Sequence, residues 1–351
     1  MIPALAELTT LRLGGPPARY EQAADEAAII AAVRAADEPL LVLAGGSNVV
    51  VADAGFPGTV VQITSRGVRA DGDALEVAAG EPWDPLVARC VEDGLAGFEC
   101  LSGIPGSVGA TPIQNVGAYG QEVAETIASV RAYDRELDMV LTVAPDECGF
   151  SYRSSTFKRT PARWVVLAVR FELERRPDSR PVRYAELARA LGIGLGERAP
   201  LADVRAAVLA LRRRKGMVID PGDPDSVSAG SFFTNPILDP AAFAALEERA
   251  GERPPRFPQQ DGRVKTSAAW LIERAGFGRG YGDPETIAIS DKHTLALTNR
   301  GAGTTAQLLA LAHEIAAGVR DAFGVELEPE PVLVGHEWSP SEPRGAAQPS
   351  R

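Results

Sequence analysis

The alternation of apolar and polar residues predicts a chain of mixed strands and helices. Short apolar or alternating stretches predict strands at 40–44, 59–63, 74–78, 129–134, 138–143 and 164–173, with two more near Thr286 and Thr294. In the stretch 164–173, Val169 and Phe171 alternate with the charged residues Arg170 and Glu172. Successive side chains of a strand point to opposite faces, so one face of this strand should be buried and the other should meet water.

Helical periodicity predicts helices at 26–36 and 204–214, from Asp84 onward, from Asp239 onward, through 270–273 and from Thr304 to Gly324. Asp84 and Asp239 each precede a proline, which is the arrangement of an N-cap followed by proline at the first helical position. Thr304 and Gln307 have the spacing of a capping box, and Gly324 is a typical helix end. The pattern therefore indicates an α+β protein of several small modules.

Local composition suggests where these modules begin and end. The stretch 94–121 is rich in glycine and too poor in large side chains to form one regular element, and prolines become frequent from about Gly216. We expect modules at 1–65, 66–215 and 216–324, a strand at 325–335, and a tail at 336–351 whose Pro, Ser and Gly content predicts disorder. No G-x-G-x-x-G follows a predicted strand and no P-loop sequence occurs, so Rossmann and P-loop folds lack their fingerprints.

The composition does not change the predicted fold, but it argues against one class of function. With 45% hydrophobic and 24% charged residues, the chain has an ordinary globular composition. Its net charge of −11 argues against nucleic-acid binding, because no general basic surface is available to displace counterions from phosphates. An anionic substrate must therefore be bound by local cations or by backbone N–H groups.

Cysteine usage and hydropathy bear on the compartment. Cys90, Cys100 and Cys148 are widely spaced and form no C-x-x-C pair, so neither a zinc site nor a disulfide framework is predicted, and no metal is expected. The N-terminus lacks the basic and apolar segments of a signal peptide, and no apolar run approaches the ~20 residues needed to cross a bilayer. We expect a cytoplasmic protein without membrane insertion.

Two glycine-rich regions are the first candidates for ligand binding. The tetrapeptide 45–48 (GGSN) follows a predicted strand and exposes backbone N–H groups that can bind a pyrophosphate, although taken alone it is better explained as a tight turn. The segments 103–110 and 114–120 have many glycines and few side chains for a core, which favours a backbone cradle for a flat or charged ligand. A flexible linker is the alternative, but the Ile, Pro, Val and Tyr residues in these segments suit a linker poorly.

These segments resemble the flavin-binding segments of UDP-N-acetylenolpyruvoylglucosamine reductases. The similarity rests on 103–110 (GIPGSVGA) and 115–120 (NVGAYG), with GGSN upstream. Four further strings follow in the order of that family: 152–158 (YRSSTFK), 229–236 (AGSFFTNP), 267–273 (SAAWLIE) and 327–330 (LEPE). The resemblance covers about residues 9 to 335 and includes Tyr184, which is similar to a tyrosine of the longer, type I branch of the family.

The resemblance implies a multi-domain FAD-binding fold of the vanillyl-alcohol-oxidase type with a separate C-terminal α/β substrate domain. The modules 1–65 and 66–215 would be the FAD-binding subdomains, 216–324 the substrate domain, and 325–335 the strand with a catalytic glutamate. The implied reaction reduces UDP-N-acetylglucosamine enolpyruvate to UDP-N-acetylmuramic acid, a precursor of peptidoglycan, with NADPH as co-substrate. FAD should be bound non-covalently, because the matched glycine-rich motifs contain no histidine or cysteine.

Three catalytic residues follow from the same resemblance. Arg153 would bind the substrate carboxylate, and its planar, permanently charged guanidinium suits that task. Ser231 would donate the proton, and Glu330 would assist formation of the enol. From composition alone, Ser231 is better explained as a turn residue and Glu330 as a solvated carboxylate, so both assignments depend on the motifs.

The binding residues are also implied by the family's motifs. FAD would be bound by Gly45, Gly46, Ser47, Asn48, Gly103, Ile104, Pro105, Gly106, Ser107, Gly109, Ala110, Asn115, Gly117, Ala118, Tyr119 and Gly120. The UDP-sugar substrate would be bound by Tyr184, Lys215, Asn235 and His293, with Lys215 on the diphosphate. A histidine of no special role explains His293 equally well, and a run of cations at a helix C-terminus explains the neighbourhood of Lys215.

Two departures from the family and two alternatives stay open. Ala44 stands where the family usually has a further glycine, and Pro331-Val332 follows Glu330 where Val-Arg is usual. The first alternative is a different flavin oxidoreductase of the same superfamily, which would lack the AGSFFTNP string. The second is a catalytically silent nucleotide-binding protein, which would have lost Arg153, Ser231 or Glu330. A monomer is expected, although no pattern in the sequence tests the oligomeric state.

Overall fold

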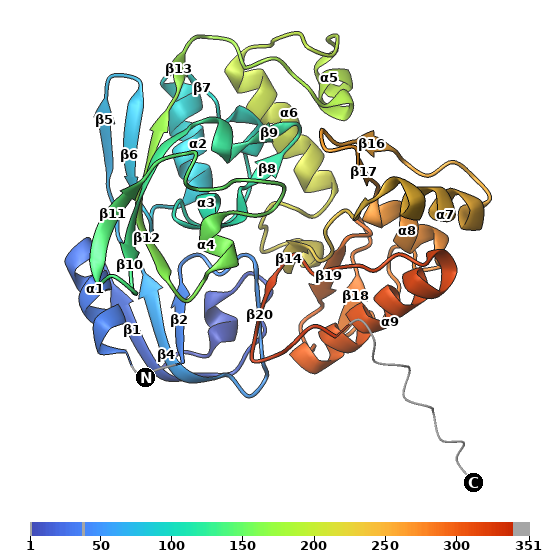
Figure 1. Ribbon diagram of the computed structural model, residues 1–351, viewed down its shortest axis with the longest axis horizontal. Helices are drawn as coiled ribbons and strands as arrows, with labels where there is room; N and C mark the ends of the chain where they lie inside the picture. The colour runs from blue at the N-terminus through green and yellow to red at the C-terminus, as the bar shows by residue number, and fades with distance from the viewer. Residues whose placement is uncertain (1, 37–38, 340–351) are drawn as a thin grey trace. The chain divides into compact units, whose positions relative to one another are not determined.

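The computed structural model describes residues 2–36 and 39–339, which fold into two compact units (Figure 1). The first unit contains residues 17–46 and 56–219, and the second contains residues 4–16, 47–55 and the chain from Asp220 onward. Most of the tail predicted to be disordered, 340–351, lies outside the described residues.

A three-stranded parallel sheet begins the first unit. Its strands β1 (Pro17–Ala23), β4 (Phe56–Ile63) and β2 (Leu40–Leu43) lie in the order β1-β4-β2. Helix α1 (Glu26–Ala35) starts after the N-cap Asp25, whose carboxylate accepts a hydrogen bond from Ala28 N–H. It buries Ile29 and Val33 beside this sheet (Figure 1). The predicted helix and the predicted strands at 40–44 and 59–63 are confirmed, whereas β1 was not predicted.

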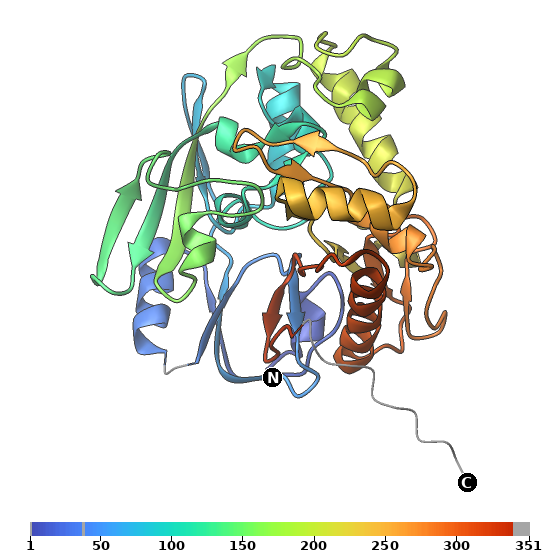
Figure 2. The same ribbon diagram turned by 45° about the vertical axis from the view of Figure 1, so that its right-hand side comes forward.

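The second sheet of this unit is antiparallel and has five strands (Figure 2). Its order is β11-β10-β12-β6-β5, with the bounds Met139–Val143, Ile127–Asp134, Trp164–Glu172, Ala74–Ala78 and Val68–Asp71. Val169 of β12 pairs with Val130 of β10 and Val77 of β6, and all three side chains are fully buried. Glu172 on the same strand is exposed, which confirms the predicted alternation.

Helices α6 and α2 of the first unit match the sequence prediction to different degrees. Helix α6 (Leu201–Arg214) buries Val204 and Val208 as predicted. Helix α2 (Trp83–Glu92) has Pro82 as its N-cap, so the prediction of Asp84 as the N-cap is wrong. The Asp84 carboxylate instead binds a backbone N–H group of the glycine-rich segment, as described below.

The glycine-rich stretch 94–121 forms no long regular element, as predicted, but it contains several short ones. The short elements of the first unit are β7 (Leu95–Ala96), η2 (Glu99–Leu101), α3 (Ala110–Gln114), β8 (Gly117–Ala118), β9 (Gln121–Glu122), η3 (Val123–Glu125), α4 (Thr156–Arg159), β13 (Glu174–Arg175) and α5 (Ala185–Leu191). Phe98, Leu101 and Val108 are fully buried in the core of the unit, so apolar packing contributes to the order of this region, which the sequence analysis did not expect.

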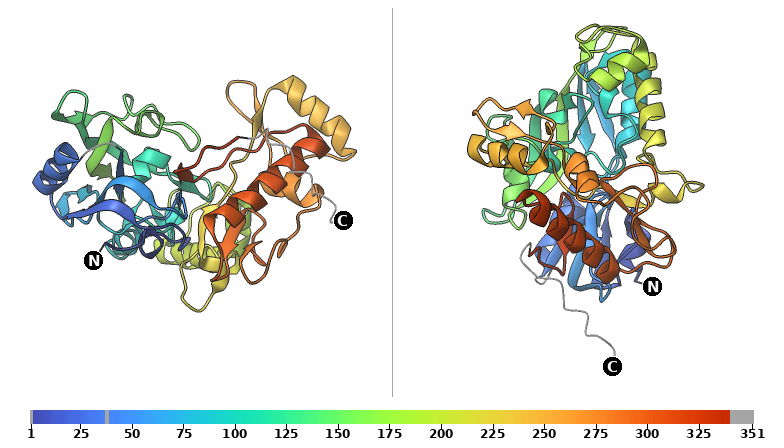
Figure 3. Two further views of the ribbon diagram at one scale, coloured as in Figure 1. Left: turned by 90° about the horizontal axis from the view of Figure 1, so that it is seen from below. Right: turned by 90° about the vertical axis from the view of Figure 1, so that its right-hand side faces the viewer.

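The second unit is built around the antiparallel sheet β14-β19-β18, with the bounds Ser228–Ser231, Ala296–Asn299 and Ile287–Ile289. The long helix α9 (Thr305–Phe323) lies beside β18 and β19 (Figure 3). Thr304 and Gln307 form the predicted capping box, and Gly324, with a φ of 70°, ends the helix.

Shorter elements complete the second unit. Helix α7 (Pro240–Ala250) has the predicted N-cap Asp239, and α8 (Ala268–Arg274) follows the N-cap Ser267. The remaining elements are η1 (Leu5–Leu8), η4 (Pro224–Ser226), β15 (Ile237–Leu238), β16 (Phe257–Pro258) and β17 (Val264–Lys265). Strand β20 (Val332–Val334) pairs in parallel with β3 (Val49–Val51), which explains why residues 47–55 belong to this unit. In the described part of the chain, no helix is long and apolar enough to cross a bilayer.

Candidate active site

The two glycine-rich segments of the first unit touch each other without side chains between them. A Cβ atom on Gly45 would lie 2.6 Å from Gly106 Cα and 2.9 Å from Gly106 C, closer than such atoms approach in real structures. Gly106 itself has a φ of 110°, a conformation that only glycine adopts readily. Both positions therefore require glycine, and the motifs at 45–48 and 103–110 meet at this contact.

Several backbone N–H groups near the Gly45–Gly106 contact have no acceptor among the described residues. Trp83 N–H donates to Gly106 O at 3.0 Å and Val108 N–H donates to Glu81 O at 2.9 Å, so the chain is paired on either side of Ser107. Among the residues that the structure describes, the N–H groups of Gly45, Gly46, Gly106 and Ser107 donate to no protein acceptor. A group of N–H donors without a nearby side chain is suited to an anion such as a pyrophosphate. The residues present thus fit the diphosphate of FAD.

A partly buried ion pair fixes the start of the second glycine-rich segment. Asp84 Oδ1 accepts from Gly103 N–H at 2.6 Å, and both carboxylate oxygens of Asp84 accept from Arg205, at 2.6 and 3.0 Å. Burial alone would raise the pKa of Asp84, but the hydrogen bonds from Arg205 and from Gly103 N–H outweigh it and hold this pKa below its ordinary value. Sequence analysis missed this role because Asp84 and Gly103 are close only in the fold.

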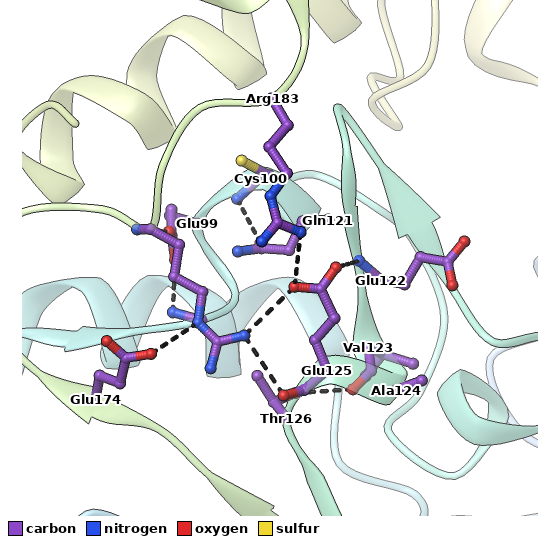
Figure 4. A network of polar contacts seen from close by, with 12 residues as sticks. Glu99, Cys100, Gln121, Glu122, Val123, Ala124, Glu125, Thr126, Glu174 and Arg183 are labelled. Carbon is purple, nitrogen blue, oxygen red and sulfur yellow. Dashed lines mark hydrogen bonds and ion pairs between the residues drawn. The ribbon is translucent and has the colours of Figure 1, made fainter. Parts of the chain in front are cut away.

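A second polar network supports residues 97–126 (Figure 4). Glu99 is fully buried; its carboxylate accepts from Gly97 N–H at 2.6 Å and from Arg180 N–H at 2.8 Å. The Arg180 guanidinium forms ion pairs with Glu174, at 3.2 Å, and with Glu125, at 3.5 Å. A buried carboxylate is costly unless its oxygens are bonded, so this network fixes the backbone that leads into 103–120.

Arg153 lies in a tight turn with a strained backbone. Ser151 and Ser154 exchange two backbone hydrogen bonds, at 3.0 and 3.1 Å, so Tyr152 and Arg153 are the central residues of the turn. Arg153 has a φ of 54°, and this left-handed conformation costs a residue other than glycine about 1 kcal/mol or more. Glycine would adopt this conformation without strain, so the positive φ marks Arg153 as an unusual position in the turn.

The turn that contains Arg153 is bonded to the segment 113–117. Arg153 Nη2 donates to Gly117 O at 2.8 Å, and Asn115 Nδ2 donates to Ser151 O at 3.0 Å. Ser155 Oγ donates to Ile113 O at 2.8 Å. The residue expected to bind the substrate carboxylate is therefore tied, within one unit, to a segment expected to bind the flavin.

Tyr119, Tyr184 and Lys215 form a cluster in the first unit. The rings of Tyr119 and Tyr184 pack edge to face with centroids 5.4 Å apart, and Lys215 Nζ lies 5.9 Å from the centroid of Tyr119. Lys215 Nζ also lies 2.8 Å from Glu186 Oε2. Burial raises the pKa of Tyr119 to about 12, so its hydroxyl stays neutral near pH 7. The structure thus brings together residues assigned to flavin and to substrate, and adds Glu186, which sequence analysis missed.

In the second unit, Ser231 and Glu330 are positioned by the backbone of Phe232. Ser231 is the last residue of β14 and pairs with Ala296 of β19. Phe232 N–H donates to Leu295 O at 2.7 Å, and Phe232 O accepts from Glu330 N–H at 2.8 Å. The residue next to the expected proton donor is therefore bonded directly to the expected catalytic glutamate.

The prolines around Glu330 occupy positions that need no backbone donor. Pro329 lies opposite Phe233, between the hydrogen bonds Thr234 N–H to Glu328 O and Glu330 N–H to Phe232 O. Beyond Pro331, Val332 N–H donates to Asn48 O at 2.9 Å, and Asn48 Nδ2 donates back to Glu330 O at 3.3 Å. Asn48, expected in the flavin site, thus binds the chain on both sides of Pro331. The unusual proline after Glu330 is accommodated without loss of pairing.

Asn235 and His293 also lie in the second unit. Asn235 Oδ1 accepts from Ala268 N–H at 3.0 Å, at the start of α8. His293 is half-buried in the loop before β19; its N–H donates to Ser290 Oγ and its carbonyl accepts from Ala296 N–H at 3.0 Å. Because Ala296 pairs with Ser231, the loop with His293 is anchored to the strand that ends at Ser231.

The candidate residues therefore form two sets, each described within its own unit. Arg153, Tyr184 and Lys215 lie in the first unit with Gly45, Gly46 and the segments 103–110 and 114–120. The second unit contains Ser47, Asn48, Ser231, Asn235, His293 and Glu330. Within residues 2–36 and 39–339, no three His, Cys, Asp or Glu side chains are grouped so that they could hold a metal ion.

Comparison with known proteins decides the family. A model of the "FAD binding domain" matches residues 17–140, and a model of the "UDP-N-acetylenolpyruvoylglucosamine reductase, C-terminal domain" matches residues 223–334. The UDP-N-acetylenolpyruvoylglucosamine reductase of Streptomyces avermitilis is 59% identical over 343 residues, covering 95% of this chain and 94% of its own. The chain belongs to the UDP-N-acetylenolpyruvoylglucosamine reductase family.

Two further relatives agree with this assignment. The UDP-N-acetylenolpyruvoylglucosamine reductase of Thermobifida fusca is 57% identical, covering 94% of this chain and 96% of its own. The crystal structure of the UDP-N-acetylenolpyruvylglucosamine reductase from Thermus caldophilus superposes with a TM-score of 0.67 at 25% identity, covering 95% of this chain and 98% of that one. The predicted family and the predicted FAD-binding, multi-domain α+β fold are confirmed.

The contact between the glycine-rich segments generates a test of the FAD cradle. Gly45→Ala places a methyl group 2.6 Å from Gly106 Cα and must push the two segments apart. Because such overpacking costs about 1–3 kcal/mol, the Kd for FAD should rise by about tenfold or more. Gly278→Ala is the matched control, since its Cβ meets no atom within 4 Å. Titration of the apoprotein with FAD measures both, and an unchanged Kd for Gly45→Ala would place the cofactor elsewhere.

The Asp84–Arg205 pair generates a pH prediction. The pKa of Asp84 is lowered in the folded state, so the pair stabilises the fold above the unfolded pKa of about 3.9 and loses this effect as the pH falls through the lower, folded value. Asp84→Asn should lower the free energy of unfolding by about 1–3 kcal/mol at pH 7. Denaturant titrations of both proteins between pH 7 and 3 should show the difference shrinking below pH 4. A constant difference would mean that the charge of Asp84 is not what stabilises the contact.

Proposed function

We propose that this protein reduces UDP-N-acetylglucosamine enolpyruvate to UDP-N-acetylmuramic acid with bound FAD, a step in the synthesis of peptidoglycan precursors. The observation that carries the proposal is the backbone pairing through Phe232, which connects Ser231 and Glu330 in the unit that matches the reductase's C-terminal domain. Family membership at 59% identity over nearly the whole chain supports the same activity.

The residues of the first unit fit the binding of the cofactor. FAD, when bound, carries a hydride from a nicotinamide donor to the enolpyruvyl double bond. The N–H groups of Gly45, Gly46, Gly106 and Ser107 would bind its diphosphate, and the close contact of Gly45 with Gly106 keeps side chains out of that space. Backbone dipoles fixed in this way bind an anion without a net positive charge, which suits a chain with a net charge of −11.

Arg153 would bind the carboxylate of the enolpyruvyl group. Its guanidinium is permanently charged and remains tied to Gly117 O at 2.8 Å, so the side chain is partly oriented before the substrate arrives. As the double bond is reduced, negative charge develops toward the carboxylate, and a fixed cation there lowers the barrier because it needs no reorganisation. The strain at φ 54° is accounted for by this requirement for a charged side chain in a tight turn.

Ser231 would donate the proton to the substrate carbon, and Glu330 would stabilise the enol that precedes protonation. A serine hydroxyl is a weak acid, so it can act only if its position relative to the reacting carbon is well defined. The backbone hydrogen bonds of Phe232 to Leu295 and to Glu330 support such positioning, because they fix the backbone of the residue next to Ser231. Glu330 is half-buried whereas Glu328 is exposed, which supports Glu330 as the functional carboxylate.

Lys215 and Tyr184 would bind the nucleotide part of the substrate, and Asn235 and His293 would complete the substrate site. Lys215 Nζ holds Glu186 at 2.8 Å, a half-exposed ion pair that is worth little and can be exchanged for a diphosphate. Asn235 uses its Oδ1 for Ala268, which leaves its amide N–H groups as the donors for a substrate oxygen.

The remaining assignments are part of the same proposal. We propose NADPH as the electron donor, a monomeric state and a cytoplasmic location, the last supported by three buried cysteines that form no disulfide. We assign FAD binding to 1–65 and 66–215, substrate binding to 216–324 and the catalytic glutamate to 325–335. The extents of the two family-model matches, 17–140 and 223–334, support this division.

The purified protein tests the function directly. It should be yellow, and acid denaturation should release FAD into the supernatant. Under anaerobic conditions NADPH should bleach the flavin absorbance, and UDP-N-acetylglucosamine enolpyruvate should restore it with formation of UDP-N-acetylmuramic acid. A flavin that NADPH reduces but the enolpyruvyl substrate does not reoxidise would point to another flavin oxidoreductase of the superfamily.

Substitutions in the second unit should separate the two half-reactions. In Ser231→Ala and Glu330→Gln, NADPH should still reduce the flavin, because neither group takes part in that step. Reoxidation by the enolpyruvyl substrate should slow by about 10²–10⁴, the usual effect of losing a positioned acid or base. Stopped-flow absorbance at the flavin band measures both half-reactions.

Glu328→Gln is the matched control, because Glu328 lies two residues before Glu330 on the same segment but is exposed. Glu328 is the other glutamate of the LEPE motif and therefore the rival assignment. Its reoxidation rate should stay close to that of the unsubstituted enzyme. If Glu328→Gln is the impaired variant, the functional carboxylate has been assigned to the wrong residue.

A further inference from the structure

A tryptophan near the C-terminus packs on the motif that contains Ser231. The family-model match ends at residue 334, but the chain continues and brings Trp338 onto Phe232 and Phe233, with centroid separations of 6.5 and 5.9 Å. These two rings pack on each other at 5.1 Å and are almost fully buried. Residues 336–339, part of the tail predicted to be disordered, therefore have defined contacts.

The indole also packs on helix α9. The rings of His313 and Trp338 are stacked, with centroids 4.3 Å apart and an angle of 9° between their planes. His313 lies in the middle of α9, between the buried residues Ala312 and Ile315, so it is a fixed support. Trp338 thus has ring contacts with His313 of α9 and with the Phe232–Phe233 pair, and these four residues are called the clamp below.

Ring packing alone fixes the indole. Trp338 Nε1 is buried, and no residue in the described part of the chain accepts a hydrogen bond from it. Tryptophan usually finds a partner for this N–H when it is buried, and leaving it unbonded is unfavourable. The contribution of Trp338 therefore comes from the packing of its ring and not from a hydrogen bond of its indole N–H.

We propose that Trp338 is a positioning residue for the reduction of the enolpyruvyl substrate, and this inference rests on the proposed function. It acts through Phe232, whose N–H binds Leu295 and whose carbonyl binds Glu330. The same short chain, from Glu330 through β20 to Trp338, thus contacts Phe232 twice, by a backbone hydrogen bond and by a ring. A displacement of Phe232 moves the attachment of Glu330 and the residue next to Ser231 together.

This coupling has a kinetic consequence. Proton transfer and enol stabilisation depend steeply on geometry, and a displacement of about 1 Å can cost a factor of about 10² in rate. Binding of the UDP part depends on residues outside the clamp, so it should be less affected. The cradle N–H groups of Gly45, Gly46, Gly106 and Ser107 belong to the other unit, so flavin reduction should not depend on Trp338.

The test uses the full-length, FAD-loaded enzyme and three variants. In Trp338→Ala, reoxidation of the reduced flavin by UDP-N-acetylglucosamine enolpyruvate should slow by about tenfold or more, within the range expected for a displaced catalytic group. Flavin reduction by NADPH should be unchanged, and the Kd of the oxidised enzyme for the substrate, measured by calorimetry, should change by less than about threefold. Trp338→Phe should restore most of the rate, since it keeps a ring and removes an unbonded N–H.

Tyr281→Ala is the matched control in the same unit. Tyr281 packs on Phe277 with centroids 5.0 Å apart and donates to Glu314 Oε1 on α9 at 2.8 Å, next to His313 but away from Phe232. It should lower the Tm without slowing reoxidation. Equal slowing in Tyr281→Ala and Trp338→Ala, or a normal rate in Trp338→Ala, would overturn the inference. An unsubstituted enzyme that the enolpyruvyl substrate fails to reoxidise would instead overturn the proposed function.

Discussion

The contact between Gly45 and Gly106 is the constraint on which the rest of the first unit depends. A chain with a net charge of −11 cannot attract a dinucleotide by its overall field, so it must present donors that carry no charge of their own. Backbone N–H groups meet this need only where no side chain covers them and no protein acceptor occupies them. This arrangement requires glycine at both positions. A Cβ on Gly45 would lie 2.6 Å from Gly106 Cα, and Gly106 has a φ of 110°.

Segments without side chains cannot hold themselves in place, and the structure shows what holds them. Asp84 fixes Gly103 and is itself fixed by Arg205, while Glu99 and Arg180 form a buried network beneath the following residues. The Asp84 carboxylate accepts from a backbone N–H group and from the guanidinium of Arg205. The Glu99 carboxylate accepts from two backbone N–H groups, those of Gly97 and Arg180. Hydrogen bonds from these charged side chains thus add to the apolar packing of Phe98, Leu101 and Val108, and they leave the N–H groups of Gly45, Gly46, Gly106 and Ser107 unbonded.

Sequence patterns predicted the regular elements well because those depend on local periodicity and end signals. Strands β6, β10, β11 and β12, the alternation around Val169 and the capping box of α9 follow from near neighbours in the chain, whereas β5 and the order of the five-stranded sheet were not predicted. The motifs also predicted the family, since several collinear strings cannot arise from composition. Asp84 was wrongly assigned as an N-cap because its true partners, Gly103 and Arg205, are 19 and 121 residues away. Glu186 and Trp338 were missed for the same reason: their contacts are long-range, and no local pattern marks them.

The strand pairing around Phe232 shows how two prolines can stand beside a residue that must be well positioned. A proline removes a donor, so it is tolerated in a pairing only where the N–H would point away from the partner strand. Pro329 faces Phe233 between two hydrogen bonds, and Pro331 lies between the bonds made by Glu330 and Val332. Glu328, Glu330 and Val332 therefore all form their backbone hydrogen bonds. Glu330 also lies between two prolines, each of which has a fixed φ. The replacement of the family's usual residue at 331 thus stiffens the segment that contains the glutamate. The pairing on both sides of Pro331 and the fixed φ of the two prolines thus restrict the backbone at Glu330.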